Sequence, residues 1–408
     1  MEQVLPRLKN KITKPVKTPF TPKVLIAEST NWVTGAELPF LFKTAGCAVD
    51  IFCKERSWLE TNSFYNKRIS FNSQIECFEL KLLELIKEAD YDWIILADDP
   101  LLHSMNNHVM DDEELSKKIL PLSNLQHRHM LGSKAGFAAF CKEYDILSPL
   151  TYVLKKDDDI ENVVNAVEYP VIIKEDVSHA GLHTYVCNNK TELVDGLSRG
   201  RNNDNLIIQK YIKGKLIFAE ALYSNGQLLS YTYSEKLKNI RHEFSGSTER
   251  LYYTNRSIEP VLIQLGKCAG LNGFASISCI YDPQKQLHYL FEADLRPNAW
   301  FAYGRFAGTD FSSAIKKIID PEIKLPGHPI LSNKKPIKIQ VFYNDMRRCI
   351  YNKDAAGLLK WLINYEGRWA YIPFYDKHLL KIQLKKLSIT FAGSFFPKQL
   401  KDFLKKLF

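Results

Sequence analysis

The sequence predicts an α/β protein whose N-terminal part is a doubly wound parallel sheet. Apolar, strand-like runs alternate with helix-like segments from residue 23 to residue 99, which is the pattern of a parallel sheet. The chain has 408 residues, too many for one simple core, so we expect two or three domains. Its apolar (45%), aromatic (12%) and charged (25%) fractions are typical of a soluble globular protein.

The expected elements of this first part follow one another without interruption. "KVLIAES", beginning at Lys23, is an apolar strand, and "GAELPFLFKTAG" is a helix that ends at Gly46. "CAVDIFCK" is a second strand, "SQIECFELKLLELIKEAD" an amphipathic helix and "YDWIILADD" a third strand that ends in acids. The sequence contains no G-x-G-x-x-G, so we expect no dinucleotide site here.

A different pattern begins near Leu120. "GSKAGFAAFCKEYDILSPLTYVL" predicts a helix and then an extended segment interrupted at Pro149. We expect helices over 158–168 and 190–198, with strands at "YPVIIKED", "HTYVCN" and "NLIIQKYIKG". The pair of strands in "KLIFAEALYSNGQLLSYTYSEK" contains Asn-Gly, a dipeptide typical of tight hairpins.

The rest of the chain is expected to mix loops, strands and helices. "NIRHEFSGSTERLYYTN" predicts a polar loop, which is followed by a helix and by two strands joined at "DPQK". The final segment predicts short strands with helices. It ends in "PKQLKDFLKKLF", whose apolar residues have the spacing of an amphipathic helix.

The net charge of +9 is concentrated at the two ends. Residues 1–23 carry +5 and residues 377–408 carry +7, which leaves −3 for the remainder. A nucleic-acid-binding body would carry its own basic stripe, so we expect no specific nucleic-acid partner. The last helix is expected to dock on the protein itself, and weak contact with an anionic membrane is the alternative.

Cysteine usage and hydropathy indicate a cytoplasmic protein. The eight cysteines form no C-x-x-C pair and have no metal-finger spacing, which fits a reducing compartment. No apolar stretch reaches the length of about 20 residues that a membrane-spanning helix needs. The N-terminus lacks the apolar core of a secretory signal.

One strand gathers charged residues on a single face. In "LHYLFEADLRPNAW", Glu292, Asp294 and Arg296 occupy alternate positions, which point to the same side of a strand. Two carboxylates suit Mg²⁺, which prefers oxygen ligands, and an arginine suits an anion. A solvated charged strand is the alternative interpretation.

Two lysines precede that strand in the sequence. Lys174 stands at the end of an apolar strand before a turn of small and polar residues, where an ammonium and backbone amides could hold phosphate. Lys134 opens a helix further upstream. A surface lysine at a strand end is the alternative interpretation of Lys174.

These elements, in this order, resemble the ATP-grasp superfamily over most of residues 23–320. The resemblance is to the carboxylate–amine ligase type, similar to the carbamoyl phosphate synthase and biotin carboxylase-like ATP-grasp fold. It implies an N-terminal Rossmann-like α/β domain, an ATP-grasp domain and a small C-terminal α+β region. The expected boundaries are a basic arm over 1–22, the parallel domain over 23–120, the ATP-grasp domain over 121–320 with its lid at about 150–212, and the C-terminal region over 321–408, ending in the basic amphipathic helix.

The resemblance also implies roles in ATP binding. "SKAGFAAFCKEYDILSP" is similar to the family's lysine-bearing helix, so Lys134 would hold the α-phosphate. "PVIIK" matches the lid strand, so Lys174 would hold the α- and β-phosphates and take part in catalysis. "QKYIKG" resembles the hinge, whose backbone at Lys210 and Ile212 would pair with adenine. The full implied ATP-binding set is Lys134, Lys174, Ser178, His179, Ala180, Gly181, Gln209, Lys210, Tyr211, Ile212 and Glu220.

"FEADLRPN" looks like the family's Glu-x-Asn-x-Arg-Pro strand. Glu292 and Asp294 would therefore bind Mg²⁺ (or Mn²⁺), and Arg296 would be the catalytic arginine that contacts the reacting oxygens. Alignment places Ser278 where a further metal-binding acid is usual, and Asp294 where Asn is usual. Either Asp294 compensates for the acid lost at Ser278, or the site has decayed.

The sequence also departs from the family pattern at the phosphate loop and after the hinge. The phosphate loop has only one glycine, Gly181, and Glu220 is the nearest acid for a ribose contact. Asp98 and Asp99 end a strand where ligands of parallel sheets tend to bind, yet a helix cap explains them equally well. His127 and His129 could bind a metal but have no third partner in the sequence. Arg241 and Arg250 bracket a Ser-Gly-Ser-Thr turn, and the matching region would face the site in the family; an ordinary solvated loop is the alternative.

The resemblance implies an ATP-dependent ligase that joins a small-molecule or peptide carboxylate to an amine. Mg-ATP would phosphorylate the carboxylate, and the amine would attack the resulting acyl-phosphate. The alternative is a degenerate ATP-grasp module that binds nucleotide without ligase activity and is recruited by its basic ends.

Overall fold

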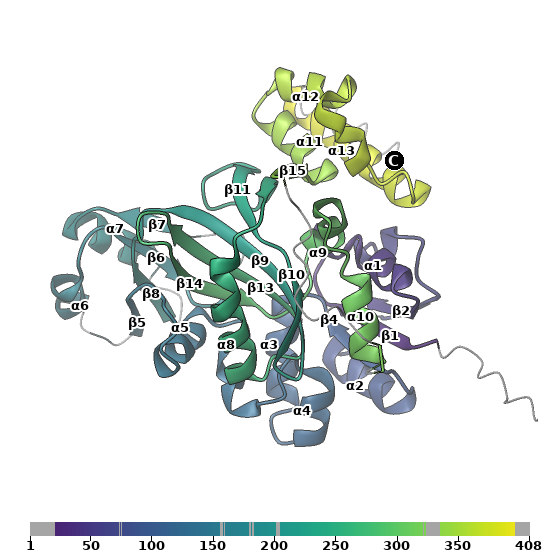
Figure 1. The fold of residues 1–408 in the computed structure, drawn as a ribbon, viewed down its shortest axis with the longest axis horizontal. Coiled ribbons are helices and arrows are strands. Elements are labelled where there is room, and N and C mark those ends of the chain that lie inside the picture. The colour runs from purple at the N-terminus through teal and green to yellow at the C-terminus, as the bar shows by residue number, and fades with distance from the viewer. Residues whose placement is uncertain are drawn as a thin grey trace, which may run out of the picture.

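The computed structural model describes residues 21–72, 74, 76–155, 158, 160–178, 181, 183–200, 205–320, 322–323 and 335–395. Their strands form three sheets, arranged as an N-terminal layer, a lid and a large central sheet, with helices added at the C-terminal end (Figure 1). The expected arm over 1–22, apart from its last two residues, and the expected helix over 397–408 lie outside the described residues.

The N-terminal sheet is parallel, as predicted, with the strand order β3-β2-β1-β4. Residues Val24 to Ala27 of β1 are fully buried, because helices cover both faces of the sheet. The three-residue strand β3 was not predicted. The elements of this part are β1 Lys23–Glu28, η1 Val33–Gly35, α1 Leu38–Thr44, β2 Ala48–Cys53, η2 Leu59–Thr61, β3 Lys67–Ile69, α2 Phe78–Glu88, β4 Trp93–Leu96, α3 Asp99–His108 and α4 Glu113–Ile119.

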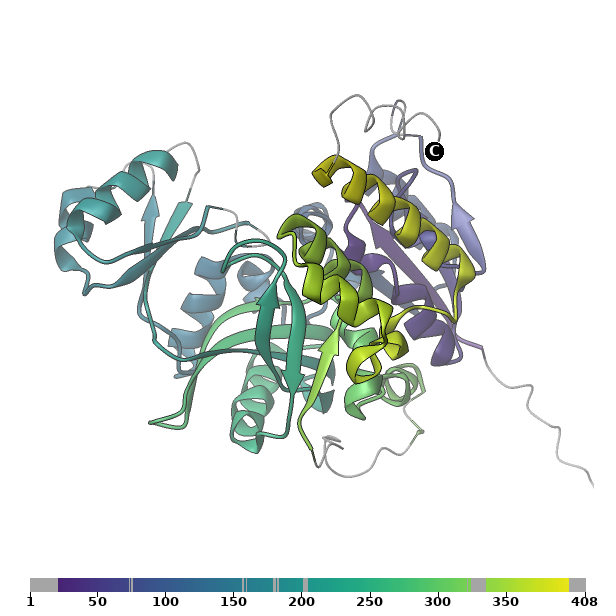
Figure 2. The same ribbon diagram turned by 90° about the horizontal axis from the view of Figure 1, so that it is seen from above.

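The lid is a small antiparallel sheet with the strand order β5-β8-β6-β7. It packs against α6 and α7 around its own apolar cluster, and it projects from the rest of the molecule (Figures 1 and 2). The elements from the connecting segment to the end of the lid are η3 Leu125–Met130, α5 Lys134–Glu143, β5 Thr151–Lys155, α6 Ile160–Ala166, β6 Val171–Glu175, β7 Tyr185–Cys187, α7 Lys190–Gly200 and β8 Asn205–Lys210.

The central sheet has the strand order β14-β13-β9-β11-β12-β15, with β10 paired to β9, and its pairs are antiparallel. Asn225 and Gly226 both have positive φ (46° and 82°), as the predicted Asn-Gly hairpin requires. The elements of this part are β9 Lys215–Ser224, β10 Gln227–Tyr231, β11 Ser234–Asn239, β12 Ser247–Tyr252, η4 Arg256–Ile258, α8 Glu259–Ala269, β13 Gly273–Asp282, β14 Leu287–Asp294, α9 Ala299–Tyr303, η5 Gly304–Ala307 and α10 Ser312–Ile319.

The polar loop predicted over 239–255 is wrong for its second half, which forms the strand β12. Its polar side chains suggested exposure, but they are buried and paired inside the protein. Arg250 contacts Glu220, and Thr248 donates a hydrogen bond to Asp345. A strand whose polar residues have buried partners cannot be distinguished by composition from a solvated loop.

The C-terminal part is mainly helical. Its one strand among the described residues, β15, extends the central sheet beside β12. The helices lie above the junction between the N-terminal layer and the central sheet (Figure 2). Within the described parts of the chain, no helix is long and apolar enough to cross a membrane. The elements are β15 Ile337–Gln340, α11 Phe342–Tyr351, α12 Ala355–Leu362, η6 Tyr365–Tyr371 and α13 Lys377–Phe395.

Candidate active site

A cavity of about 750 Å³ lies between the lid and the central sheet and continues beneath the C-terminal helices. An adjoining cavity of about 170 Å³ shares five lining residues with it. The walls of the cavity come from four parts of the chain: the segment after β1, the lid, the central sheet, and the helices α11 and α13. The shared residues are Trp32, Lys134, Ser178, Glu292 and Asp294.

Lys134 is the first residue of α5, whose N-cap is Ser133. Its ammonium donates hydrogen bonds to the carbonyl oxygens of Asp176 (3.0 Å) and Ser178 (2.9 Å), and it lies 3.3 Å from a carboxylate oxygen of Glu292. The Asp176 carboxylate accepts bonds from the Ser133 hydroxyl and the Ala135 amide. These contacts tie the helix start to the loop after β6.

Lys174 is buried near the end of β6, which corrects the interpretation of this residue as an exposed surface lysine. Its ammonium donates to the side-chain oxygen of Gln209 (2.9 Å) and lies 4.9 Å from the centre of the Phe291 ring. Burial lowers the pKa of Lys174 to about 8, and the negative charge of Glu292 partly opposes that shift. A charge held in this way is poised to bind an anion.

The loop between β6 and β7 lies against the segment after β11. Gly181 has φ +66°, and a Cβ at this position would come within 2.2 Å of the carbonyl oxygen of Phe244, so the close approach requires glycine. Ser178 and Gly181 line the cavity. His179 and Ala180 lie outside the described residues.

The hinge residues Gln209 to Ile212 all line the cavity. The amide of Tyr211 donates to the carbonyl of Pro170, whereas the N–H of Ile212 has no hydrogen-bond partner among the described residues. The amide of Lys210 donates to Leu150, so only its carbonyl is available for a base. The wall beside the hinge is apolar and would accept a flat ring: Ile172, Leu216, Phe218, Ile280 and Phe291.

Two carboxylates and a serine share one end of the cavity. Ser278 of β13 lies directly opposite Glu292 of β14 in the sheet register. Burial, followed by repulsion from Asp99, raises the pKa of Asp294 in the absence of a bound cation. Within the described part of the chain no group of three His, Cys, Asp or Glu residues forms a metal cluster, so a bound cation would depend on these carboxylates and on oxygens of the ligand.

Arg296 lines the cavity and is paired with an acid that the sequence did not indicate. It is buried and forms a two-pronged ion pair with Asp99, whose carboxylate lies 2.6 Å from Nε. A weaker contact of 3.4 Å joins it to Asp294, and these two acids raise its pKa. Asp99 therefore links the N-terminal layer to the site strand, while Asp98 caps α3 by accepting from the amide of Leu101.

Glu220 does not line the cavity. It is fully buried in β9 and accepts from Arg250 (2.7 Å) and Thr232 (3.1 Å), which differs from the ribose contact expected of it. Arg250 itself reaches the cavity, where its guanidinium lies between the rings of Phe218 (3.8 Å) and Trp300 (4.2 Å). The buried glutamate thus holds an arginine at the cavity wall.

Two further sites considered from the sequence are not supported by the geometry. His127 is buried, and its Nε2 lies 2.9 Å from the hydroxyl of Tyr144. Arg241 stacks on Tyr351 and does not line the cavity.

No sequence motif pointed to seven further residues that line the cavity, six of them aromatic or basic. They come from elements distant in sequence: Trp32, Trp58, Lys236, Tyr343, Asn344, Arg347 and Lys386. Asp176 was also missed, although it closely follows Lys174 in the sequence and could have been found as a helix-start partner.

Comparison with known proteins identifies the fold. Residues 129–217 match the model of the RimK-like ATP-grasp domain. The chain is 26% identical over 138 residues to a D-alanine–D-alanine ligase of Fervidobacterium nodosum, a match that covers 31% of this chain and 44% of the relative's length.

Two solved structures illustrate the similarity in fold over three quarters or more of the chain. The ADP complex of PurK, an N5-carboxyaminoimidazole ribonucleotide synthetase, matches with a TM-score of 0.63 at 12% identity, over 85% of this chain and 86% of that one. An L-amino acid ligase from Bacillus licheniformis matches with a TM-score of 0.53 at 13% identity, over 75% and 78%.

The two antiparallel sheets that enclose the cavity, together with these similarities, show the ATP-grasp fold. The parallel N-terminal sheet that precedes them completes the α/β fold predicted from the sequence. The segment that carries Lys134, Lys174 and the hinge lies within the part of the chain that matches the RimK-like model.

Proposed function

We propose that this chain is an ATP-dependent ligase that joins a carboxylate to an amine through an acyl-phosphate. The observation that supports the proposal most is the meeting of Lys134, Lys174, Glu292 and Asp294 at one end of a cavity large enough for a nucleotide and a second substrate. Two of the similar proteins are by name ligases of amino acids, which is chemistry of the same class.

Each residue has a physical task in this reaction. Transfer of the γ-phosphoryl group gathers negative oxygens, which fixed positive charges stabilise in a cavity of low polarity. Lys174 and Lys134 would hold the phosphates, and Lys134 is already oriented by the loop carbonyls. Glu292 and Asp294 would hold Mg²⁺, which supplies further positive charge to the phosphate oxygens.

The lid would protect the acyl-phosphate from hydrolysis. Its loop at Gly181 already lies against Phe244, so the phosphate end of the cavity is covered on that side. Exclusion of water strengthens the electrostatic contacts and prevents loss of the activated acid.

A second candidate function is nucleotide binding without ligation. Two observations favour it: Ser278 stands where a further acid would neutralise the metal, and Arg296 is engaged by Asp99. Such a protein would bind Mg-nucleotide with the same residues but would not activate a carboxylate.

Hydroxylamine trapping distinguishes the two candidates without knowledge of the natural amine. The full-length protein would be incubated with Mg-ATP, hydroxylamine and a panel of amino acids, dipeptides and other carboxylic acids. The ligase proposal expects ADP release and a hydroxamate that depend on one class of acid and disappear in Glu292→Gln. Nucleotide binding without hydroxamate from any acid would contradict it and favour the second candidate.

A further inference from the structure

One part of the cavity is lined by residues of the C-terminal helices. Tyr343 and Arg347 lie one turn apart on α11, and Lys386 comes from α13. Trp58, just before η2, joins them from the N-terminal part. Figure 2 shows α11 and α13 side by side above the junction of the two main parts. None of these elements carries the proposed phosphate or metal residues.

Two cations and two rings meet there. The ammonium of Lys386 lies 4.0 Å from the centre of the Trp58 ring, and the Arg347 guanidinium lies 5.4 Å from that of Tyr343. The two rings are themselves 4.8 Å apart. Both aromatic residues are buried, so the pair forms a rigid apolar surface with a positive charge beside each ring.

These two cations form no ion pair with an acid among the described residues. The guanidinium of Arg347 donates to the hydroxyl of Tyr351, at 3.3 Å. Burial and then repulsion by Arg347 lower the pKa of Lys386. Like charges that lie together raise the free energy of the empty site, and a bound anion would offset this.

Asn344 provides an independent indication of a ligand. It lines the same cavity, only 8% of its surface is exposed, and its side-chain oxygen has no hydrogen-bond partner among the described residues. A buried polar atom left without a partner costs about 1–3 kcal/mol, so such atoms usually face a ligand or water. A donor group on a bound molecule would form the missing hydrogen bond to this side-chain oxygen.

We propose that Arg347 and Lys386 bind a carboxylate or phosphate group of the second substrate, whose flat or apolar body lies against Trp58 and Tyr343. A hydrogen-bond donor on that body would satisfy Asn344. We assign this anionic group to a part of the substrate that does not react; the proposed phosphate and metal residues come from other elements, α5, β6 and β14. The assignment to a substrate rests on the proposed ligase function, whereas anion binding does not.

Aryl anions test the proposal. Phenylacetate and phenyl phosphate would be titrated calorimetrically into the full-length protein, with and without MgADP, and phenylacetamide would serve as the neutral probe. We expect at least one aryl anion to bind and the amide not to bind. The double variant Arg347→Gln/Lys386→Gln should weaken the anion at least tenfold and leave MgADP affinity unchanged. Whichever anion binds more tightly identifies the charged group.

A double variant on α13 is the matched control. Lys381→Gln/Lys385→Gln removes the same charge from exposed positions that do not line the cavity, and it should bind the anion like the wild type. Equal anion binding by the Arg347→Gln/Lys386→Gln variant, equal binding of the amide, or no binding of either anion to the wild type would overturn the proposal. Failure of MgADP to bind would instead contradict the ligase function and leave the anion site standing.

Discussion

The surroundings of Lys174 illustrate how one residue can combine a structural cost with a function. Its ammonium is buried and, among the described residues, donates to one side chain, that of Gln209, which in turn donates to Thr151. A buried charge with one neutral partner destabilises the folded state, because water would solvate the ammonium better. Such an arrangement is typical of charged groups whose counter-charge is supplied by a bound ligand.

We expect Lys174→Met to weaken MgADP binding about 10- to 100-fold, because a charge-assisted contact contributes about 1.5–3 kcal/mol. The free energy of unfolding should stay the same or rise, since the buried charge is removed. Calorimetric titration and thermal unfolding measure the two effects. Lys190→Met, which removes an exposed ammonium paired with Glu161, is the control. An unchanged affinity in Lys174→Met would remove this residue from the site.

The lowered pKa of Lys174 predicts a pH dependence. Only the protonated lysine attracts phosphate, so wild-type affinity for MgADP should fall as pH rises through about 8, by up to about tenfold per pH unit. Binding above this pH should take up a proton. The fall should be absent in Lys174→Met over the same range. Identical pH profiles for the two proteins would show that this group does not control binding.

This chain has Ser278 where the resembled pattern usually has an acid, and Asp294 where that pattern usually has an amide. This exchange makes a reciprocal prediction. If Glu292 and Asp294 together neutralise Mg²⁺, Asp294→Asn should lower Mg-dependent nucleotide affinity by about tenfold or more. Ser278→Glu, opposite Glu292 in the sheet, should restore it in the double variant. Simple addition of the two single effects would mean that the positions share no partner.

The sequence predicted those site residues that follow a regular element. Lys134 was predicted from the resemblance to a lysine-bearing helix and Glu292 from the alternation of charged residues along a strand, and both line the cavity. Asp99 as the partner of Arg296 was not predictable, since the two lie 197 residues apart and meet only through packing. For the same reason the sequence could not show that Lys174 is buried.

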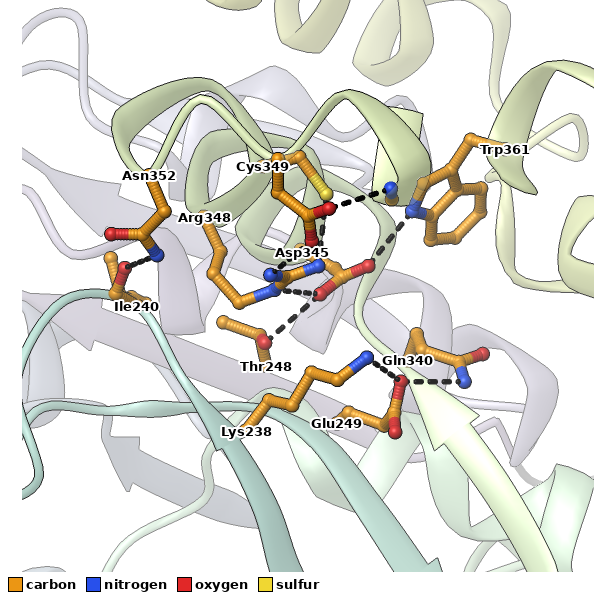
Figure 3. A network of polar contacts seen from close by, with 12 residues as sticks. Lys238, Ile240, Thr248, Glu249, Gln340, Asp345, Arg348, Cys349, Asn352 and Trp361 are labelled. Carbon is orange, nitrogen blue, oxygen red and sulfur yellow. Dashed lines mark hydrogen bonds and ion pairs between the residues drawn. The ribbon is translucent and has the colours of Figure 1, made fainter. Parts of the chain in front are cut away.

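At the level of elements, the helix α11 connects the C-terminal part to the central sheet. Figure 3 shows the polar network around Asp345. This fully buried carboxylate accepts from Thr248 of β12 (3.1 Å) and, among its neighbours on the helical side, from Arg348 (2.6 Å) and Trp361 (2.9 Å). Its effect is to fix the face of α11 that carries Arg347 over the cavity.

We expect Asp345→Asn to lower the free energy of unfolding by about 3–5 kcal/mol, because it leaves Arg348 and Arg368 with less of their buried counter-charge. Chemical denaturation measures the change. The control is Asp195→Asn, whose pair with Arg199 is exposed and should contribute less than about 1 kcal/mol. A loss below about 1 kcal/mol in Asp345→Asn would show that the network does not stabilise the helix.

Element prediction succeeded where hydrophobic periodicity was strong and failed where polar residues are paired inside the fold. The amphipathic helix at α2 and the apolar strand at β1 were both found. The strand β12 was missed because Thr248, Glu249 and Arg250 have buried partners rather than solvent. No local pattern reports a partner that lies far away in sequence.

At the scale of the whole molecule, three parts meet around one cavity. Asp99 and Arg296 join the N-terminal layer to the central sheet. The C-terminal part is held to the N-terminal layer by Asp376, which accepts from Ser63, and by Tyr375, which donates to Glu37. The nucleotide end and the proposed anion site are therefore positioned by contacts between parts, and these contacts are the least predictable from sequence.

Titration of the full-length protein with MgADP tests the central claim most directly. We expect one nucleotide per chain, with an affinity that falls when Mg²⁺ is removed by chelation and falls further in Lys174→Met. The Lys190→Met control should bind like the wild type. Absence of nucleotide binding, or binding that is unaffected both by Mg²⁺ removal and by Lys174→Met, would contradict the assignment of this cavity as a Mg-nucleotide site.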